Sequence, residues 1–170
     1  MEKIHKVQLK LVLEVKRICD KHNIKYVLMA GTLLGAVRHS GFIPWDDDLD
    51  IGMLRDDFEK FIKVARSELV EDFFLQTWDT DKNFGLPFAK LRVNGTKYVE
   101  KNSSKTGGHD GIFIDIFPFD NVPQKPIARI VHNISTYILK KLMLSKLGYE
   151  VWNERDHSKK AIYKVIRLIS

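Results

Sequence analysis

The sequence has a single cysteine among its 170 residues and lacks any long uninterrupted run of apolar side chains. One thiol excludes an internal disulfide framework and is typical of a reducing compartment. Lys10, Glu14 and Lys16 interrupt the N-terminal segment, which therefore lacks the apolar core of a secretory signal. No run is apolar for long enough to span a bilayer. Together these absences predict a cytoplasmic protein.

Most of the chain has no excess of basic side chains. The basic excess is concentrated at the C-terminal end. The net charge is +6. Residues 1–120 hold 18 basic and 19 acidic side chains, whereas residues 121–170 hold 10 and 3. A basic tail suits nucleic acid or an anionic membrane face, although a solvated helix surface is the commoner reason for one. We expect no nucleic-acid partner.

Hydrophobic periodicity predicts an α/β (α+β) protein with a mixed sheet flanked by helices. Apolar residues recur at helical steps over residues 4–21, over 33–37 and again from Phe58 to Ala65. Further segments have the short apolar or alternating pattern of strands. These segments are residues 26–29, the stretch from Asp48 to Ile51, residues 73–78, 88–93 and 112–117, with Pro118 expected to end the last.

The region after Pro123 and Pro126 again repeats apolar residues at helical steps. We therefore divide the chain into a core over residues 1–125 and a basic helical region over 126–170. The pattern runs to the last residue without a helix stop signal, which indicates a truncated polypeptide or a short relative. The helical region mixes apolar and lysine side chains, which suits either packing on the sheet or peripheral contact with an anionic membrane. Its amphipathic pattern favours packing on the sheet.

Four carboxylates lie within five residues, from Asp46 to Asp50. Such a group is tolerated when it is well solvated or when a cation neutralises it. If the segment is a strand, Asp48 and Asp50 point to the same side. Asp115, between two isoleucines of another predicted strand, is expected to add a third carboxylate. Carboxylate oxygens suit hard cations, so we predict a site for Mg²⁺ or Mn²⁺.

The acidic segment has two other interpretations. An EF-hand requires glycine at its sixth position and glutamate at its twelfth, where this sequence has Ile51 and Asp57, so we reject it. A solvated acidic loop that caps the next helix is the simpler interpretation for Asp46 or Asp47 taken alone.

Gly31 and Thr32 follow the first predicted strand and precede a short predicted helix. Glycine allows the backbone to approach a phosphate, and the helix N-terminus offers free N–H groups and a favourable dipole. The dipeptide alone is a weak signal. Combined with a strand that carries two carboxylates, it predicts the two halves of a phosphoryl-transfer site.

Three segments resemble the motifs of the LicD family, which comprises choline-phosphate transferases and their relatives, including the fukutin-related proteins. The longest is AGTLLGAVRHSGFIPWDDDLDIG at residues 30–52. The others are AKLRVNGT at 89–96 and GIFIDIFPFD at 111–120, in the family's order and spacing. The resemblance covers roughly residues 5–125.

The resemblance implies a nucleotidyltransferase-like fold and a specific reaction. A phospho-substituent such as phosphocholine or phosphoribitol would pass from a CDP-linked donor such as CDP-choline to a hydroxyl of a glycan or glycolipid acceptor. In that scheme Asp48 and Asp50 correspond to the metal-binding pair and Asp115 to the third acidic position. We predict that all three hold the metal and that Asp115 also serves as general base. The scheme adds Asp46 as an assisting ligand and places the donor phosphate at Gly31 and Thr32.

Three basic residues lie inside or beside these motifs, namely Arg38, Lys90 and Arg92. They are predicted to neutralise the diphosphate, because arginine can grip two oxygens at once. The alternative, pairing with the acidic cluster to hold the fold, is nearly as strong for Arg92. Two rival functions also stay open: a true nucleotidyltransferase that keeps the nucleotide on its product, and a non-catalytic binding domain.

Overall fold

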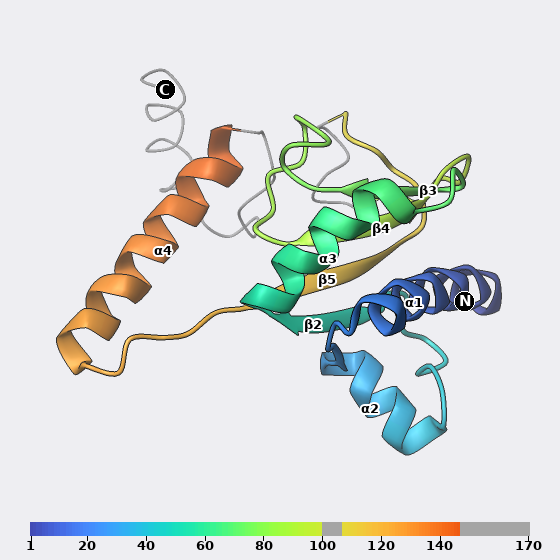
Figure 1. The fold of residues 1–170 in the computed structure, drawn as a ribbon, viewed down its shortest axis with the longest axis horizontal. Helices are drawn as coiled ribbons and strands as arrows, with labels where there is room; N and C mark the ends of the chain where they lie inside the picture. The colour runs from blue at the N-terminus through green and yellow to red at the C-terminus, as the bar shows by residue number, and fades with distance from the viewer. Residues whose placement is uncertain (100–106, 147–170) are drawn as a thin grey trace.

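A computed structural model describes residues 1–99 and 107–146 (Figure 1). It has the α/β architecture with a mixed sheet and a C-terminal helix that the sequence predicts. The elements are α1 (Glu2–His22), β1 (Val27–Leu28), α2 (Ala30–His39), β2 (Asp50–Leu54), α3 (Arg55–Glu68), β3 (Phe73–Gln76), β4 (Ala89–Val93), β5 (Phe113–Phe119) and α4 (Pro126–Lys146).

The five strands form one sheet in the order β1-β2-β5-β4-β3. β2 and β5 run parallel, and the other neighbouring pairs are antiparallel. A parallel pair needs a long crossover, and here α3, β3 and β4 lie between β2 and β5 in the chain. As a result, the acidic segment and the motif around Asp115, some 65 residues apart in sequence, lie on adjacent central strands.

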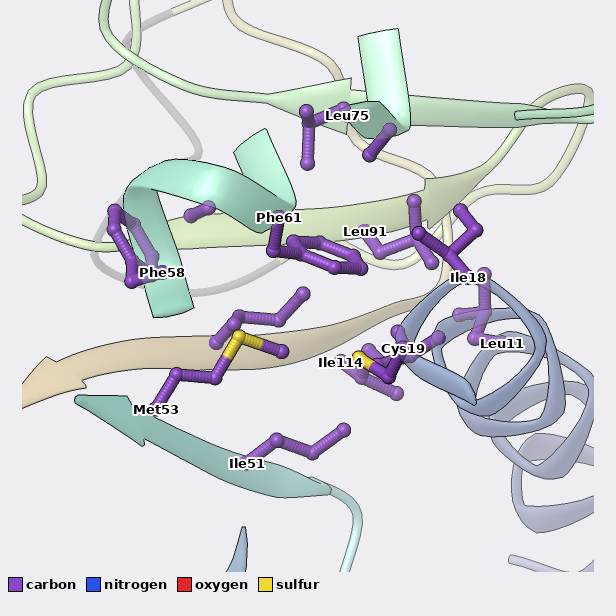
Figure 2. Packing of buried hydrophobic residues seen from close by; sticks show 14 of the residues in the cluster. Leu11, Ile18, Cys19, Ile51, Met53, Phe58, Phe61, Leu75, Leu91 and Ile114 are labelled. Carbon is purple, nitrogen blue, oxygen red and sulfur yellow. The ribbon is translucent and has the colours of Figure 1, made fainter. Parts of the chain in front are cut away.

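The hydrophobic core lies between one face of the sheet and helices α1 and α3 (Figure 2). Leu11 and Ile18 of α1 and Phe61 of α3 are fully buried against Leu91 and other strand residues. Each such side chain contributes about 1.5–3 kcal/mol through burial. Since side chains alternate along a strand, the residues between the core positions point to the opposite face of the sheet. We call that opposite side the polar face.

The two strands that carry Asp50 and Asp115 have other boundaries than predicted. β2 begins at Asp50 rather than Asp48, so Asp48 belongs to the loop before the strand. β5 continues through Pro118 to Phe119 instead of ending at the proline. Pairing with β4 stops at Ile116, while pairing with β2 continues to Phe119. Pro118 therefore lies where β5 has a neighbour on one side only, and its missing N–H costs no ladder hydrogen bond there.

The C-terminal helix differs from its predicted environment. Its apolar side chains, from Ile127 to Leu142, are 38–78% exposed, so the prediction that this helix packs on the sheet is wrong for the described part of α4. Figure 1 shows α4 apart from the sheet, connected to β5 by an extended segment. Across residues 1–99 and 107–146, no helix combines the length and hydrophobicity needed to cross a membrane. The predicted helical pattern over 166–170 lies outside the described residues.

Candidate functional site

A row of four polar residues crosses the polar face in direct register. Asp50 on β2 is opposite Asp115 on β5, and Asp115 is opposite Lys90 on β4. Lys90 is in turn opposite Gln76 on β3. Neighbouring strands lie about 4.8 Å apart, so adjacent members of the row are within reach of each other. The predicted proximity of Asp50 and Asp115 is confirmed, while their chemical roles stay predictions.

Lys90 forms the centre of this row and is almost completely buried, with 2% of its side chain exposed. Its Nζ lies 2.8 Å from Asp115 Oδ1 and 3.4 Å from the centroid of the Phe113 ring. A buried ammonium requires such compensation, because losing water costs several kcal/mol (an order-of-magnitude figure). The ion pair and the aromatic face supply it. Lys90 therefore holds Asp115 in place.

Arg92 lies on the same side of β4, two residues further on, and is equally buried. Its Nε donates to Gln76 Oε1, and its Nη1 donates to the Gly111 carbonyl at 2.6 Å. The guanidinium also lies 4.7 Å from the centroid of Phe113. These contacts join β4 to β3 and to the segment that leads into β5. They favour the fold-holding alternative for Arg92, with Gln76 and Gly111 as partners in place of the acidic cluster.

The loop that carries Asp46, Asp47 and Asp48 is held by the first helix. His5 Nε2 lies 2.6 Å from the Asp46 carbonyl oxygen. Gln8 Nε2 donates to the Asp47 carbonyl at 2.8 Å and to the Phe113 carbonyl at 3.3 Å. Sequence reasoning missed both residues. The available signal was Gln8 itself, a polar residue at helical spacing within the apolar stripe of α1.

The first turn of α2 lies against the start of β2. The Thr32 hydroxyl accepts a hydrogen bond from the Asp50 N–H at 2.8 Å. A Cβ on Gly31 would lie 2.5 Å from Asp46 Oδ2, so glycine is required for the close approach of this carboxylate. The helix begins at Ala30, after an extended Met29. Gly31 and Thr32 therefore belong to its first turn, rather than to a loop before a later helix as predicted.

The carboxylates near this turn repel one another. Burial, followed by the charges of Asp48, Asp115 and Asp46, raises the pKa of Asp50 to about 6, although Lys90 opposes the rise. Burial and Asp46 likewise raise the pKa of Asp48. The charges of Asp46 and Asp48 in the loop therefore act on Asp50 in the strand, even though Asp48 lies outside β2. A cation bound among them would relieve this repulsion.

The carboxylates of this site are the donor set available to a metal ion. No group of three His, Cys, Asp or Glu side chains within residues 1–99 and 107–146 forms a ready-made metal cluster. Mg²⁺, however, is typically bound by one or two carboxylates, several waters and substrate phosphates. The adjacent carboxylates of Asp50 and Asp115, with Asp48 close by, fit that mode. The four-ligand set Asp46, Asp48, Asp50 and Asp115 stays a prediction.

Arg38 is not brought to the row. It is exposed in the last turn of α2, seven residues after Gly31. At a rise of 1.5 Å per residue, this places it about 10 Å further along the helix. In the part of the chain that the structure describes, Arg38 forms no ion pair. Its predicted contact with donor phosphate stays a prediction.

Comparison with known proteins identifies the family. The sequence model described as LicD/FKTN/FKRP, nucleotidyltransferase domain, matches residues 23–144, which include β1 to β5 and nearly all of α4. The chain belongs to this family. The LicD resemblance seen in the three sequence motifs is thereby confirmed, and every member of the polar row lies within the matched segment.

Individual relatives cover different shares of this LicD-family chain. The lipopolysaccharide cholinephosphotransferase LicD of Haemophilus influenzae is 37% identical over 110 residues, which is 64% of this chain and 40% of that protein. An uncharacterized protein of Rickettsia typhi is 54% identical over 54 residues, 32% of this chain and 18% of its own length. The human ribitol 5-phosphate transferase FKRP is 42% identical over 40 residues, or 24% and 8%. The matched segments thus span between 8% and 40% of the length of these relatives.

Proposed function

We propose that this chain carries the donor-binding and catalytic part of a phosphotransferase. It would transfer a phospho-substituent, with phosphocholine as the first candidate, from a CDP-linked donor to a hydroxyl of a cell-surface glycan. The observation that carries the proposal is the row Asp50, Asp115 and Lys90 beside the first turn of α2. The names of two relatives, a cholinephosphotransferase and a ribitol 5-phosphate transferase, support this reaction class.

The first turn of α2 is suited to the donor diphosphate. N–H groups in the first turn of a helix have no intrahelical acceptor, and the helix dipole favours negative charge there. Gly31 has no side chain between its backbone and Asp46 Oδ2, which lies where a Cβ would be. Thr32 is fixed by the hydrogen bond from Asp50 N–H, so the turn and the carboxylate strand keep a constant relation. Phosphate at the turn would therefore lie close to the row.

A divalent ion, Mg²⁺ or Mn²⁺, held by Asp48, Asp50 and Asp115, would neutralise the donor phosphates and lower the pKa of the acceptor hydroxyl. Asp115 accepts the proton of that hydroxyl as its oxygen attacks phosphorus. The new O–P bond forms while the bond from phosphorus to the bridging oxygen breaks, and CMP leaves with the electron pair. Lys90, at 2.8 Å, keeps Asp115 oriented for this step.

The test measures CMP release from CDP-choline with and without Mg²⁺, together with donor protection against thermal unfolding. Asp50→Asn should abolish release and Mg²⁺-dependent protection while the protein stays folded, because the substitution removes one of several mutually repelling charges. Asp56→Asn, at an exposed acid in the first turn of α3, is the matched control and should behave as wild type. EDTA should reproduce the effect of Asp50→Asn.

The outcomes separate the rival functions. Pyrophosphate in place of CMP, obtained with a nucleoside triphosphate donor, would assign the chain to true nucleotidyltransferases. Protection by CDP-choline without any turnover would indicate a binding domain. Near-normal CMP release by Asp50→Asn would remove the metal and the acidic row from the mechanism.

A further inference from the structure

Helix α4 presents an apolar stripe to solvent. At 100° per residue, six exposed aliphatic side chains fall on one side of the helix, and Tyr137 lies at the edge of that side. This α4 stripe consists of Ile127, Ile130, Val131, Ile134, Ile138 and Leu142. A stripe of this length on a regular helix is too large to be explained as scattered surface hydrophobics.

The charges of α4 have one sign only. From residue 121 to residue 146 the sequence has no Asp or Glu, and it has five Lys or Arg. Arg129 and Lys140 lie on the side of the helix opposite the α4 stripe. By the same spacing, Lys141 falls within the angular range of the stripe, between Ile130 and Ile134, and its Nζ lies 5.6 Å from the centroid of the Tyr137 ring. A lysine in such a position can extend its ammonium to the headgroups while its methylene stem stays among apolar side chains, and basic residues on the opposite side are typical of helices at a lipid–water interface.

Charge complementarity decides between occupants of the stripe. Two copies of α4 packed stripe to stripe would cover the apolar side chains, but neither helix has an acidic side chain between residues 121 and 146 to pair with the basic residues of the other. An anionic bilayer supplies what the helix lacks, an apolar interior for the stripe and negative headgroups for the lysines and arginines. Since α4 does not qualify as a membrane-spanning helix, lying in the plane of the interface is the geometry that remains.

We propose that α4 lies in the headgroup region of an anionic lipid surface, with the α4 stripe directed toward the acyl chains. The proposal is independent of the reaction, because it rests on the exposure and charge of α4 and on no residue of the polar row. It also gives the basic C-terminal region, where the excess positive charge of the chain is concentrated, a defined partner.

Co-sedimentation with lipid vesicles tests this directly. Vesicles of phosphatidylcholine and phosphatidylglycerol in equal amounts should bind the protein, and raising the salt concentration should weaken binding. Vesicles of phosphatidylcholine alone should bind much less. Equal binding to both kinds of vesicle, or binding to neither, would overturn the proposal. Substituting Tyr137→Trp adds a second measurement, a blue shift of tryptophan emission on mixing with the anionic vesicles.

A matched pair of variants separates insertion from simple charge attraction. Ile134→Asp and Asn133→Asp each add one negative charge at neighbouring positions, the first inside the α4 stripe and the second outside it. Added charge alone predicts a loss of about fivefold in partitioning for both variants. Loss of the buried isoleucine adds about tenfold or more for Ile134→Asp. Equal losses in the two variants would contradict insertion of the stripe.

Two controls keep the result distinct from the proposed reaction. Asp50→Asn should bind vesicles as wild type does, since binding is measured without donor. Sedimentation of the protein without lipid should show a monomer. If it shows a dimer that Ile134→Asp dissociates, the stripe is an interface between copies and the lipid proposal fails.

Discussion

The two faces of the sheet are built from alternate residues of the same strands, yet they are stabilised differently. On the core face, Leu91 and Ile114 pack against helices and need only apolar neighbours of suitable size. On the polar face, Lys90 is as deeply buried as Leu91, but its burial depends on Asp115 and Phe113 at specific positions. The comparison shows that burial alone does not mark a residue as structural. One face provides non-directional stability, and the other fixes charged groups.

The largest expected effect comes from breaking the buried pair on the polar face. Lys90→Met should lower the free energy of unfolding by about 3–5 kcal/mol, because it leaves the Asp115 carboxylate without its ammonium partner. Urea denaturation followed by circular dichroism measures this loss. Leu91→Ala, one residue away on the core face, is expected to cost about 2–5 kcal/mol through the cavity it creates.

The double variant Lys90→Met with Asp115→Leu sharpens the comparison. Removing both charges should recover much of the stability lost in Lys90→Met, since no unpaired charge remains buried. No such second-site recovery is expected for Leu91→Ala. If Lys90→Met is as stable as wild type, Lys90 does not hold Asp115 in the way the distance of 2.8 Å suggests.

A smaller effect on stability, with a larger effect on donor binding, is expected at the α2 turn. In Gly31→Ala the new Cβ meets the flexible end of Asp46, so the side chain can turn aside and unfolding should change by only about 1 kcal/mol. The displaced Asp46 should weaken Mg²⁺-dependent protection by CDP-choline. In Gly41→Ala the nearest atom is 4.0 Å away, so this variant should retain normal protection. Equal protection of both variants would show that the Asp46 position is unimportant.

The smallest expected effect on stability is at Asp81, which accepts a hydrogen bond from Gln76 of the polar face. Burial alone would raise the pKa of Asp81, but hydrogen bonds from His109 N–H, Gln76 and Asn83 N–H outweigh it and lower the pKa. The resulting stability is present above the unfolded pKa of about 3.9 and is lost as pH falls through the lower folded value. Asp81→Asn should reduce this acid-side slope. The change, measured by urea denaturation between neutral and acidic pH, should be about 1 kcal/mol or less because Asp81 is partly exposed. An unchanged slope would contradict the assignment.

Periodicity in the sequence predicted the helices, the strands and which residues face the core, because these depend on local spacing. It also placed Asp50 and Asp115 on strands with their side chains directed to one side. The partner of Lys90 could not be predicted in the same way. Alternation shows that Lys90 and Arg92 share a face, but the pairing of Lys90 with Asp115 depends on strand order and register.

Other differences have equally physical causes. Arg38 was linked to the site because it is close to Gly31 in sequence, but a helix carries its two ends apart. Asp48 was assigned to a strand by alternation that in fact starts in the preceding loop. The pattern of α4 is the same for a helix that faces a core and for one that faces another apolar phase, so the sequence did not distinguish these environments.

The Gln8 side chain has a consequence for how the protein can be divided. One amide nitrogen bonds the carbonyls of Asp47 and Phe113, and thereby ties the entrances of β2 and β5 to α1. The family match starts at residue 23, after this helix has ended. A fragment trimmed to the matched boundaries would keep Asp50 and Asp115 on their paired strands but would lose the hydrogen bonds by which α1 holds the entrances of β2 and β5.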